Sequence, residues 1–127
     1  MKLLDNQLDE PSLTKLGEEA GRLFIARDFQ RLAATFGYAL AYNRDTAEAI
    51  EADFEYCLAG RCTTQSKHSP TVESVTVKNF QPNDAGLLSV VECILSIDKN
   101  ARVLIELIAA KNGENKNLYL EDINAMA

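Results

Sequence analysis

The sequence is poor in the residues that most often carry enzymatic chemistry. It contains one histidine, His68, in 127 residues. His68 lies in a polar stretch between Lys67 and Ser69, which predicts a solvated surface side chain. With its single histidine so placed, the chain offers no Ser–His–Asp set, and the sequence has no glycine-rich phosphate loop. These absences exclude the common hydrolase and nucleotide-binding motifs.

Cysteines are also few, and their spacing does not suit a structural metal site. Cys57 and Cys62 are separated by four residues, and Cys93 stands alone further along the chain. A second pair of ligands that could complete a zinc site is missing, and three cysteines cannot form a complete disulfide framework. We therefore expect reduced cysteines acting as small apolar residues in a cytoplasmic protein, with no metal and no cofactor.

Basic residues are in deficit, and no apolar run is long enough to cross a membrane. The chain has 13 Lys and Arg against 19 Asp and Glu, a net charge of −6. This balance argues against nucleic acid or an anionic membrane surface as a partner. The start, Met1–Asp5, acquires an acid before any apolar run develops, unlike a signal peptide. With 46% hydrophobic and 25% charged residues, the composition indicates one soluble domain over residues 1–127.

Two long apolar runs, residues 87–97 and 103–110, predict a central β-hairpin. The intervening Asp98–Asn100 is typical of a three-residue loop, which would pair Ile97 with Ala101. A two-residue loop would move Glu106 onto the apolar face, so the pattern favours the odd length. The predicted core face consists of Val91, Cys93, Leu95, Ile97, Val103, Ile105 and Leu107.

The opposite face of this hairpin is half apolar, which favours an interface. Glu92 and Glu106 are expected directly opposite each other there, where like charges repel. Tyr119 of the last strand is expected beside Glu106. The predicted homodimer interface consists of Val90, Glu92, Ile94, Arg102, Leu104, Glu106, Ile108 and Tyr119.

The remaining local signals place helices before strands. The expected order is two helices (residues 9–26 and 28–37), a short strand (38–42), a third helix (45–60) and a four-strand meander (72–80, 87–97, 103–110 and 116–124). Asp9, Asp28 and Asp45 are placed to cap the three helices. Helices segregated from an antiparallel sheet predict an α+β fold.

Three finer expectations concern the lead-in, the first helix and the last strand. Residues 1–8 are expected to be poorly fixed. Gly17 and Gly21 lie one turn apart, which predicts close approach of the helix to its neighbour. Pairing across a tight turn at residues 112–113 is expected to bring Leu118 and Asp122 to the core face, with Leu118 beside Leu107.

Three segments resemble one known superfamily. Ala26–Phe36 is similar to its second helix, Asp45–Ile50 with Phe54 to its third, and Tyr119–Asn124 to its last strand. With the order of elements, these segments resemble the nuclear transport factor 2-like superfamily, also called the cystatin-like α+β cone, over most of the chain. The resemblance implies three helices on a curved antiparallel sheet, with a cone-shaped pocket between them. This superfamily includes catalysts such as ketosteroid isomerases and polyketide cyclases as well as non-catalysts.

The isomerase chemistry of that superfamily does not transfer to this chain. Its oxyanion-donor tyrosine corresponds to Ala20, and its aspartate base falls near Arg44. Asp122 is the one candidate for its neutral carboxylic acid. Since two of three groups are missing, we reject that chemistry.

Two functional hypotheses remain open. The first is a non-catalytic homodimer that binds a small apolar or weakly polar ligand, or a protein. The second is a small general acid–base enzyme, isomerase-like or cyclase-like, that uses a pocket carboxylate and a tyrosine. The candidate ligand-binding residues are Tyr38, Tyr42 and Asp122. A pocket closed by bulky side chains would favour the first hypothesis, and an open pocket with Asp122 at its depth would favour the second.

Overall fold

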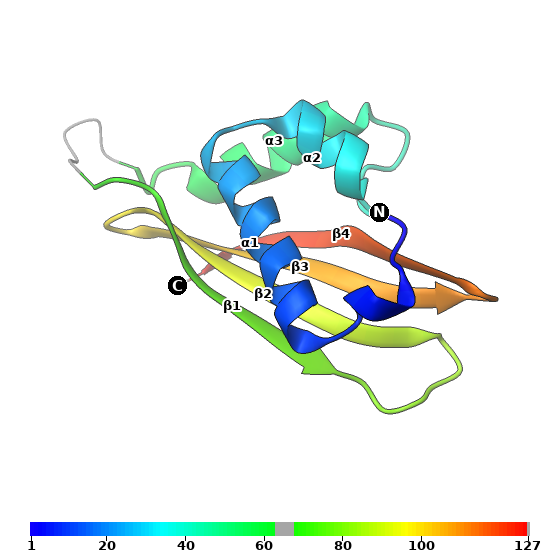
Figure 1. Ribbon diagram of the computed structural model, residues 1–127. Helices are drawn as coiled ribbons and strands as arrows, with labels where there is room; N and C mark the ends of the chain where they lie inside the picture. The colour runs from blue at the N-terminus through cyan, green and yellow to red at the C-terminus, as the bar shows by residue number, and fades with distance from the viewer. Residues whose placement is uncertain (63–67, 127) are drawn as a thin grey trace.

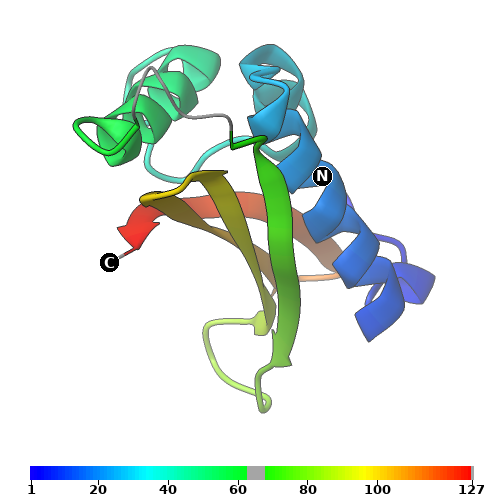
Figure 2. The ribbon, with the colours of Figure 1, turned by 90° about the vertical axis from the view of Figure 1, so that its left-hand side faces the viewer.

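Three helices lie on one face of a four-stranded antiparallel sheet (Figures 1 and 2). The computed structural model describes residues 1–62 and 68–126. Its elements are a short 3₁₀ helix (Asp5–Gln7), α1 (Glu10–Ile25), α2 (Phe29–Phe36), α3 (Thr46–Leu58), β1 (Thr71–Asn79), β2 (Leu87–Asp98), β3 (Ala101–Asn112) and β4 (Asn115–Met126). The strands pair in chain order, so the α+β prediction is confirmed. No described helix is long and apolar enough to span a membrane.

The predicted register of the central hairpin is confirmed from Ser89 to Ser96. Cys93 pairs with Ile105, and Leu95 pairs with Val103. The loop differs from the prediction, because Asp98 pairs with Ala101 and the register shifts between Ser96 and Asp98. A two-residue loop with a bulge at its start therefore replaces the three-residue loop. The extra residue in the bulge leaves an odd number of residues between Ser96 and Arg102, as the predicted three-residue loop would. Glu106 therefore stays off the core face.

The pairing of β3 with β4 is displaced by two residues from the prediction. Leu118 pairs with Ala109 instead of Leu107. The turn begins one residue later than expected, because Asn112 pairs with Asn115 around Gly113. Gly113 has φ of 64°, a left-handed conformation that glycine adopts without strain.

A bulge in β4 changes which face Asp122 occupies. Leu107 pairs with Leu120 but Glu106 pairs with Asp122, so Glu121 is an extra residue in the strand. The prediction that Asp122 shares the core face is therefore wrong. It lies in register with Glu106 on the outer face, and Ile123 enters the core instead.

The two glycines of α1 allow the helix to lie close to the sheet, as predicted. A Cβ atom at Gly17 would lie 2.7 Å from a methyl of Val75 and 2.7 Å from a methyl of Val91. One at Gly21 would lie 2.8 Å from the Cys93 sulfur. The caps are also confirmed: Asp9 accepts from the backbone N–H of Ser12, Asp28 from that of Arg31, and Asp45 from that of Glu48.

The space between the helices and the sheet is filled by large apolar side chains. The ring centroids of Phe24 on α1 and Phe54 on α3 lie 5.2 Å apart. The largest fully buried side chains come from both layers: Phe24, Phe54, Leu13, Leu32, Ile50, Leu95, Ile105, Leu107, Leu118, Leu120, Val91 and Val103. Where the resemblance implies a hollow cone, the described residues form a packed core.

Two peripheral predictions are wrong. The lead-in is fixed on β4, because the Met1 ammonium donates to the Leu118 carbonyl and the N–H of Leu3 donates to the carbonyl of Lys116, each at 2.8 Å. Leu3 is buried as a result. The short strand at 38–42 reduces to one parallel bridge between Tyr38 and Leu120, after which the chain turns.

Candidate functional site

Tyr38 is buried, and its hydroxyl takes part in a charged network. It donates to Oδ2 of Asp53 at 2.6 Å. Arg44 binds the same carboxylate through both terminal nitrogens, at 3.0 and 3.1 Å. Burial and the hydrogen bond to Asp53 raise the pKa of Tyr38 far above its ordinary value. The hydrogen bonds from Arg44 and Tyr38 lower the pKa of Asp53 against the opposing effect of burial.

This network ties the loop before α3 to the helix itself. Arg44 also donates to the backbone carbonyls of Leu40 and Ala41, at 2.7 and 2.9 Å. These bonds hold a loop in which Tyr42 and Asn43 adopt left-handed φ of 43° and 41°. Because the proton of Tyr38 is already donated to a carboxylate, its hydroxyl is poorly suited to act as a general acid. The network therefore acts as a structural clamp.

The depressions found among the described residues are not lined by Tyr38, Tyr42 or Asp122. Tyr38 is buried, whereas Tyr42 is 72% exposed. Asp122 is partly buried in β4, and its carboxylate accepts from the N–H of the next residue at 2.9 Å. Its charge is close enough to contribute to the raised pKa of Tyr38. Sequence reasoning missed Asp53 and Arg44, which are neighbours of Tyr38 only through the loop geometry.

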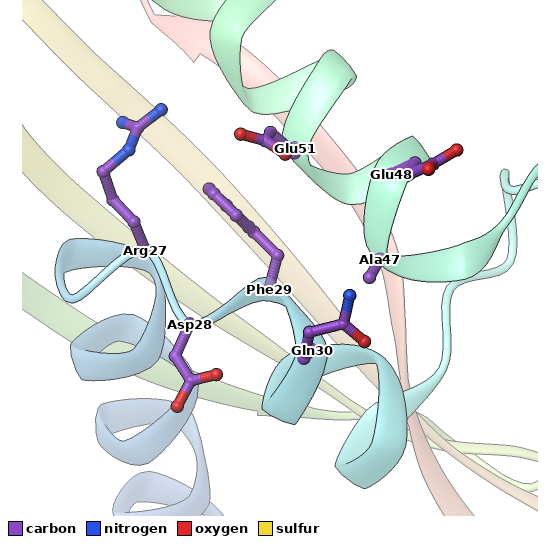
Figure 3. A pocket seen from close by; sticks show the side chains of 7 residues that line it. All are labelled: Arg27, Asp28, Phe29, Gln30, Ala47, Glu48 and Glu51. Atoms are coloured by element: carbon purple, nitrogen blue, oxygen red, sulfur yellow. The ribbon is translucent and has the colours of Figure 1, made fainter.

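A polar depression lies between α2 and α3 (Figure 3), with a volume of about 420 Å³. Arg27, Asp28, Phe29 and Gln30 line one side, and three residues of α3 line the other. The guanidinium of Arg27 lies 5.4 Å from the Phe29 ring centroid and forms an ion pair with Glu55. Its charge is thus already engaged within the protein.

A second depression, of about 510 Å³, runs between α1 and the edge strand β1. Arg22 and Ile25 line the helix side, and Val72 and Val75 line the strand side. Both depressions lie at the surface, and neither reaches the packed space between helices and sheet.

The cysteines and the histidine do not form a metal centre. Among residues 1–62 and 68–126, no three His, Cys, Asp or Glu side chains are grouped to hold a metal ion. Cys57 and Cys93 are buried free thiols, and Cys62 is an exposed one. Burial raises the pKa of the Cys93 thiol to about 12, which makes it a poor nucleophile. His68 is exposed as predicted, with Nε2 2.9 Å from the Ser96 hydroxyl.

The outer face of the sheet, here called the open face, is the surface turned away from the three helices (Figure 2). Its apolar side chains run across β2, β3 and β4: Val90 pairs with Ile108, which pairs with Tyr119. Ile94 pairs with Leu104 two rows of side chains further along, beyond the pair Glu92–Glu106. All eight residues predicted for the interface lie on this face, although Tyr119 lies beside Ile108 and not beside Glu106.

A row of carboxylates crosses the middle of the open face. Glu92 pairs with Glu106, as predicted, and Glu106 pairs with Asp122. Lys78 of β1 reaches Glu92, with its Nζ 2.6 Å from Oε1. Burial and the neighbouring charges of Asp122, Glu92 and Glu121 raise the pKa of Glu106. Arg102 does not pair with this row and forms an ion pair with Glu73 of β1 at 2.5 Å.

Searches of protein-family models, curated proteins and solved structures find no match to the chain.

Proposed function

We propose that this chain is a non-catalytic, protein-binding homodimeric module of the nuclear transport factor 2-like type, in which a second copy docks on the open face. The observation that carries the proposal is a set of five apolar side chains on a sheet face without a helix over it among the described residues. Ile94, Leu104 and Tyr119 are partly exposed there, and Val90 and Ile108 are each 9% exposed. These apolar side chains form two rows on either side of the carboxylate row, and apolar side chains gathered on an uncovered face favour an interface.

The size of the open face supports a second copy as its occupant. Four strands about 4.8 Å apart give a width of about 19 Å, and 12-residue strands rising about 3.3 Å per residue give a length of about 40 Å. The face therefore covers roughly 700 Å². A stable protein interface buries about 800 Å² on each partner, so the whole face suits one docked copy.

The positions of Lys78 and of the β4 carboxylates suit the same occupant. Lys78 lies on β1, at one side of the face, whereas Glu121 and Asp122 lie on β4, at the other. A two-fold axis parallel to the strands would place β1 of each copy over β4 of the other. The lysine of one copy would then approach the carboxylates of its partner.

Binding of a small ligand inside the cone has less support, because the interior is filled by side chains such as Phe24, Phe54 and Leu107. The enzymatic alternative has less support for a related reason. Asp122 lies in register with the outer face, and the Tyr38 proton is held by Asp53. Neither observation favours acid–base catalysis at these residues.

A matched pair of variants tests the proposal. Leu104→Asp places a charge in the middle of the open face, and Leu4→Asp makes the same change at an exposed position of the lead-in, where Leu4 is 61% exposed. We expect Leu104→Asp to be monomeric and Leu4→Asp to remain dimeric by sedimentation equilibrium. Equal association of the two variants would contradict docking on this face.

A further inference from the structure

The charges at the centre of the open face are unbalanced. Glu92, Glu106 and Asp122 occupy one row across β2, β3 and β4, with Glu121 beside them in the bulge. Among the described residues, the cation that pairs with this row is Lys78, which reaches Glu92, whereas Arg102 on the same face pairs with Glu73. Apolar side chains lie immediately on both sides of this row, so the carboxylates form a charged strip between two apolar rows.

Those apolar neighbours determine what docking would do to the carboxylates. Val90 and Ile108 lie in the row on one side of Glu92 and Glu106, and Ile94 and Leu104 lie in the row on the other. A partner that covers these apolar rows must also cover the glutamates between them. The carboxylates would then lose contact with water, which disfavours their charged form.

A two-fold dimer would not neutralise the row by itself. An axis parallel to the strands and between β2 and β3 would place Glu92 of each copy over Glu106 of the other. Lys78 would approach Asp122 of the partner, but one lysine for each copy cannot balance four carboxylates. The two copies together would bring eight carboxylates and two lysines into the same region.

We propose that docking of two copies through the open face takes up protons at the row Glu92–Glu106–Asp122, so that mild acidity favours the dimer and alkaline pH separates it. This inference rests on the proposed function, because it assumes the same partner on the same face.

The direction of the pH dependence follows from the sign of the pKa changes. The pKa of Glu106 is already raised in the single chain by burial and by its acidic neighbours. Covering the row in a dimer removes water from these carboxylates, which disfavours their charged form and raises their pKa values relative to the single chain. A dimer whose carboxylates have higher pKa values than the monomer's binds more protons. The dimer is therefore most stable at pH values below the pKa values that these carboxylates have in the monomer. It weakens as pH rises through the pKa values that they have in the dimer.

The size of the effect is set by the number of carboxylates that change. A rise of one unit in the pKa of one group changes the dissociation constant up to about tenfold across its titration range. Because the dimer is two-fold symmetric, each carboxylate counts twice. We therefore expect the dissociation constant to rise by at least about tenfold between about pH 5 and about pH 8.

The test is sedimentation equilibrium of the full chain at both pH values, with two neutral variants. Glu106→Gln and Asp122→Asn keep the shape of each side chain and remove its charge; the asparagine retains an oxygen that can accept the backbone hydrogen bond. The control, Glu19→Gln, changes the net charge by the same amount on α1, where Glu19 is exposed. We expect each open-face variant to bind more tightly at pH 8 than the wild type, and the control to match the wild type.

Three results would overturn the inference. A wild-type dimer of equal strength at both pH values, or a tighter one at pH 8, would contradict proton uptake while leaving docking on the open face intact. An unchanged pH dependence in both open-face variants would assign the effect to other groups. A wild-type chain that is monomeric at both pH values would contradict the proposed function together with this inference.

Discussion

Gly17 of α1 lies directly against Val91 at the centre of the sheet, with room for a hydrogen atom but not for a methyl group. A Cβ atom built on Gly17 would lie 2.7 Å from Cγ1 of Val91 and 2.7 Å from Cγ1 of Val75. Two branched side chains from adjacent strands thus set the distance between the helix layer and the sheet.

This contact predicts that Gly17→Ala destabilises the protein. Alanine favours a helix over glycine by about 1 kcal/mol, but overpacking a filled core costs about 1–3 kcal/mol. The clash should prevail, because Val91 is fully buried and has little room to move. Chemical denaturation would measure a lower free energy of unfolding. The double variant Gly17→Ala with Val75→Ala should recover part of the loss, and a stabilised Gly17→Ala protein would refute the close contact.

The central hairpin predicts the largest losses of stability on truncation. Leu95 and Ile105 are both fully buried, as the alternation of apolar residues predicted. Replacing either with alanine should lower the free energy of unfolding by about 2–5 kcal/mol. Tyr56, which is 85% exposed, provides the control. Tyr56→Ala should change the free energy of unfolding by less than about 0.5 kcal/mol. Similar small losses at all three positions would contradict the register.

The network of Tyr38, Asp53 and Arg44 predicts a pH-dependent contribution to stability. The pKa of Asp53 is lowered in the folded chain, chiefly by its hydrogen bonds to Arg44. A pKa that is lower in the folded chain contributes stability at pH values above the pKa of Asp53 in the unfolded chain. This contribution is lost as pH falls through the pKa of Asp53 in the folded chain. Asp53→Asn should therefore be less stable than the wild type at neutral pH, and the difference should shrink in acid. Denaturation curves at several pH values would measure it, and a constant difference would argue against an ionised clamp.

The elements and the central register could be predicted because each rests on a repeated local signal. Alternation over more than ten residues determines which face of β2 and β3 carries Leu95 and Ile105, so an error at the loop does not propagate along the strands. The caps at Asp9 and Asp45 likewise depend on residues only three positions away.

The features that sequence reasoning missed depend on single events or on distant partners. The bulge in β4 falls at Glu121 and Asp122, two adjacent acids that give no alternation from which to detect an extra residue. Leu3 is one of four apolar side chains in the lead-in that show no regular spacing, and its burial follows from backbone pairing with β4. The contact of Asp53 with Tyr38 depends on the left-handed turn at Tyr42 and Asn43, which no local sequence pattern predicts. The face of Asp122 and the charged partner of Tyr38 could therefore not be predicted from the sequence.

The mass of the unmodified chain in solution tests most directly whether two copies associate. Sedimentation equilibrium at about pH 5 and tens of micromolar protein, where the carboxylate row is closest to neutral, gives the most favourable conditions. We predict a mass twice that of one chain, which falls toward the mass of one chain on dilution because the dimer dissociates. A mass of one chain at every concentration under these conditions would contradict the proposed dimer.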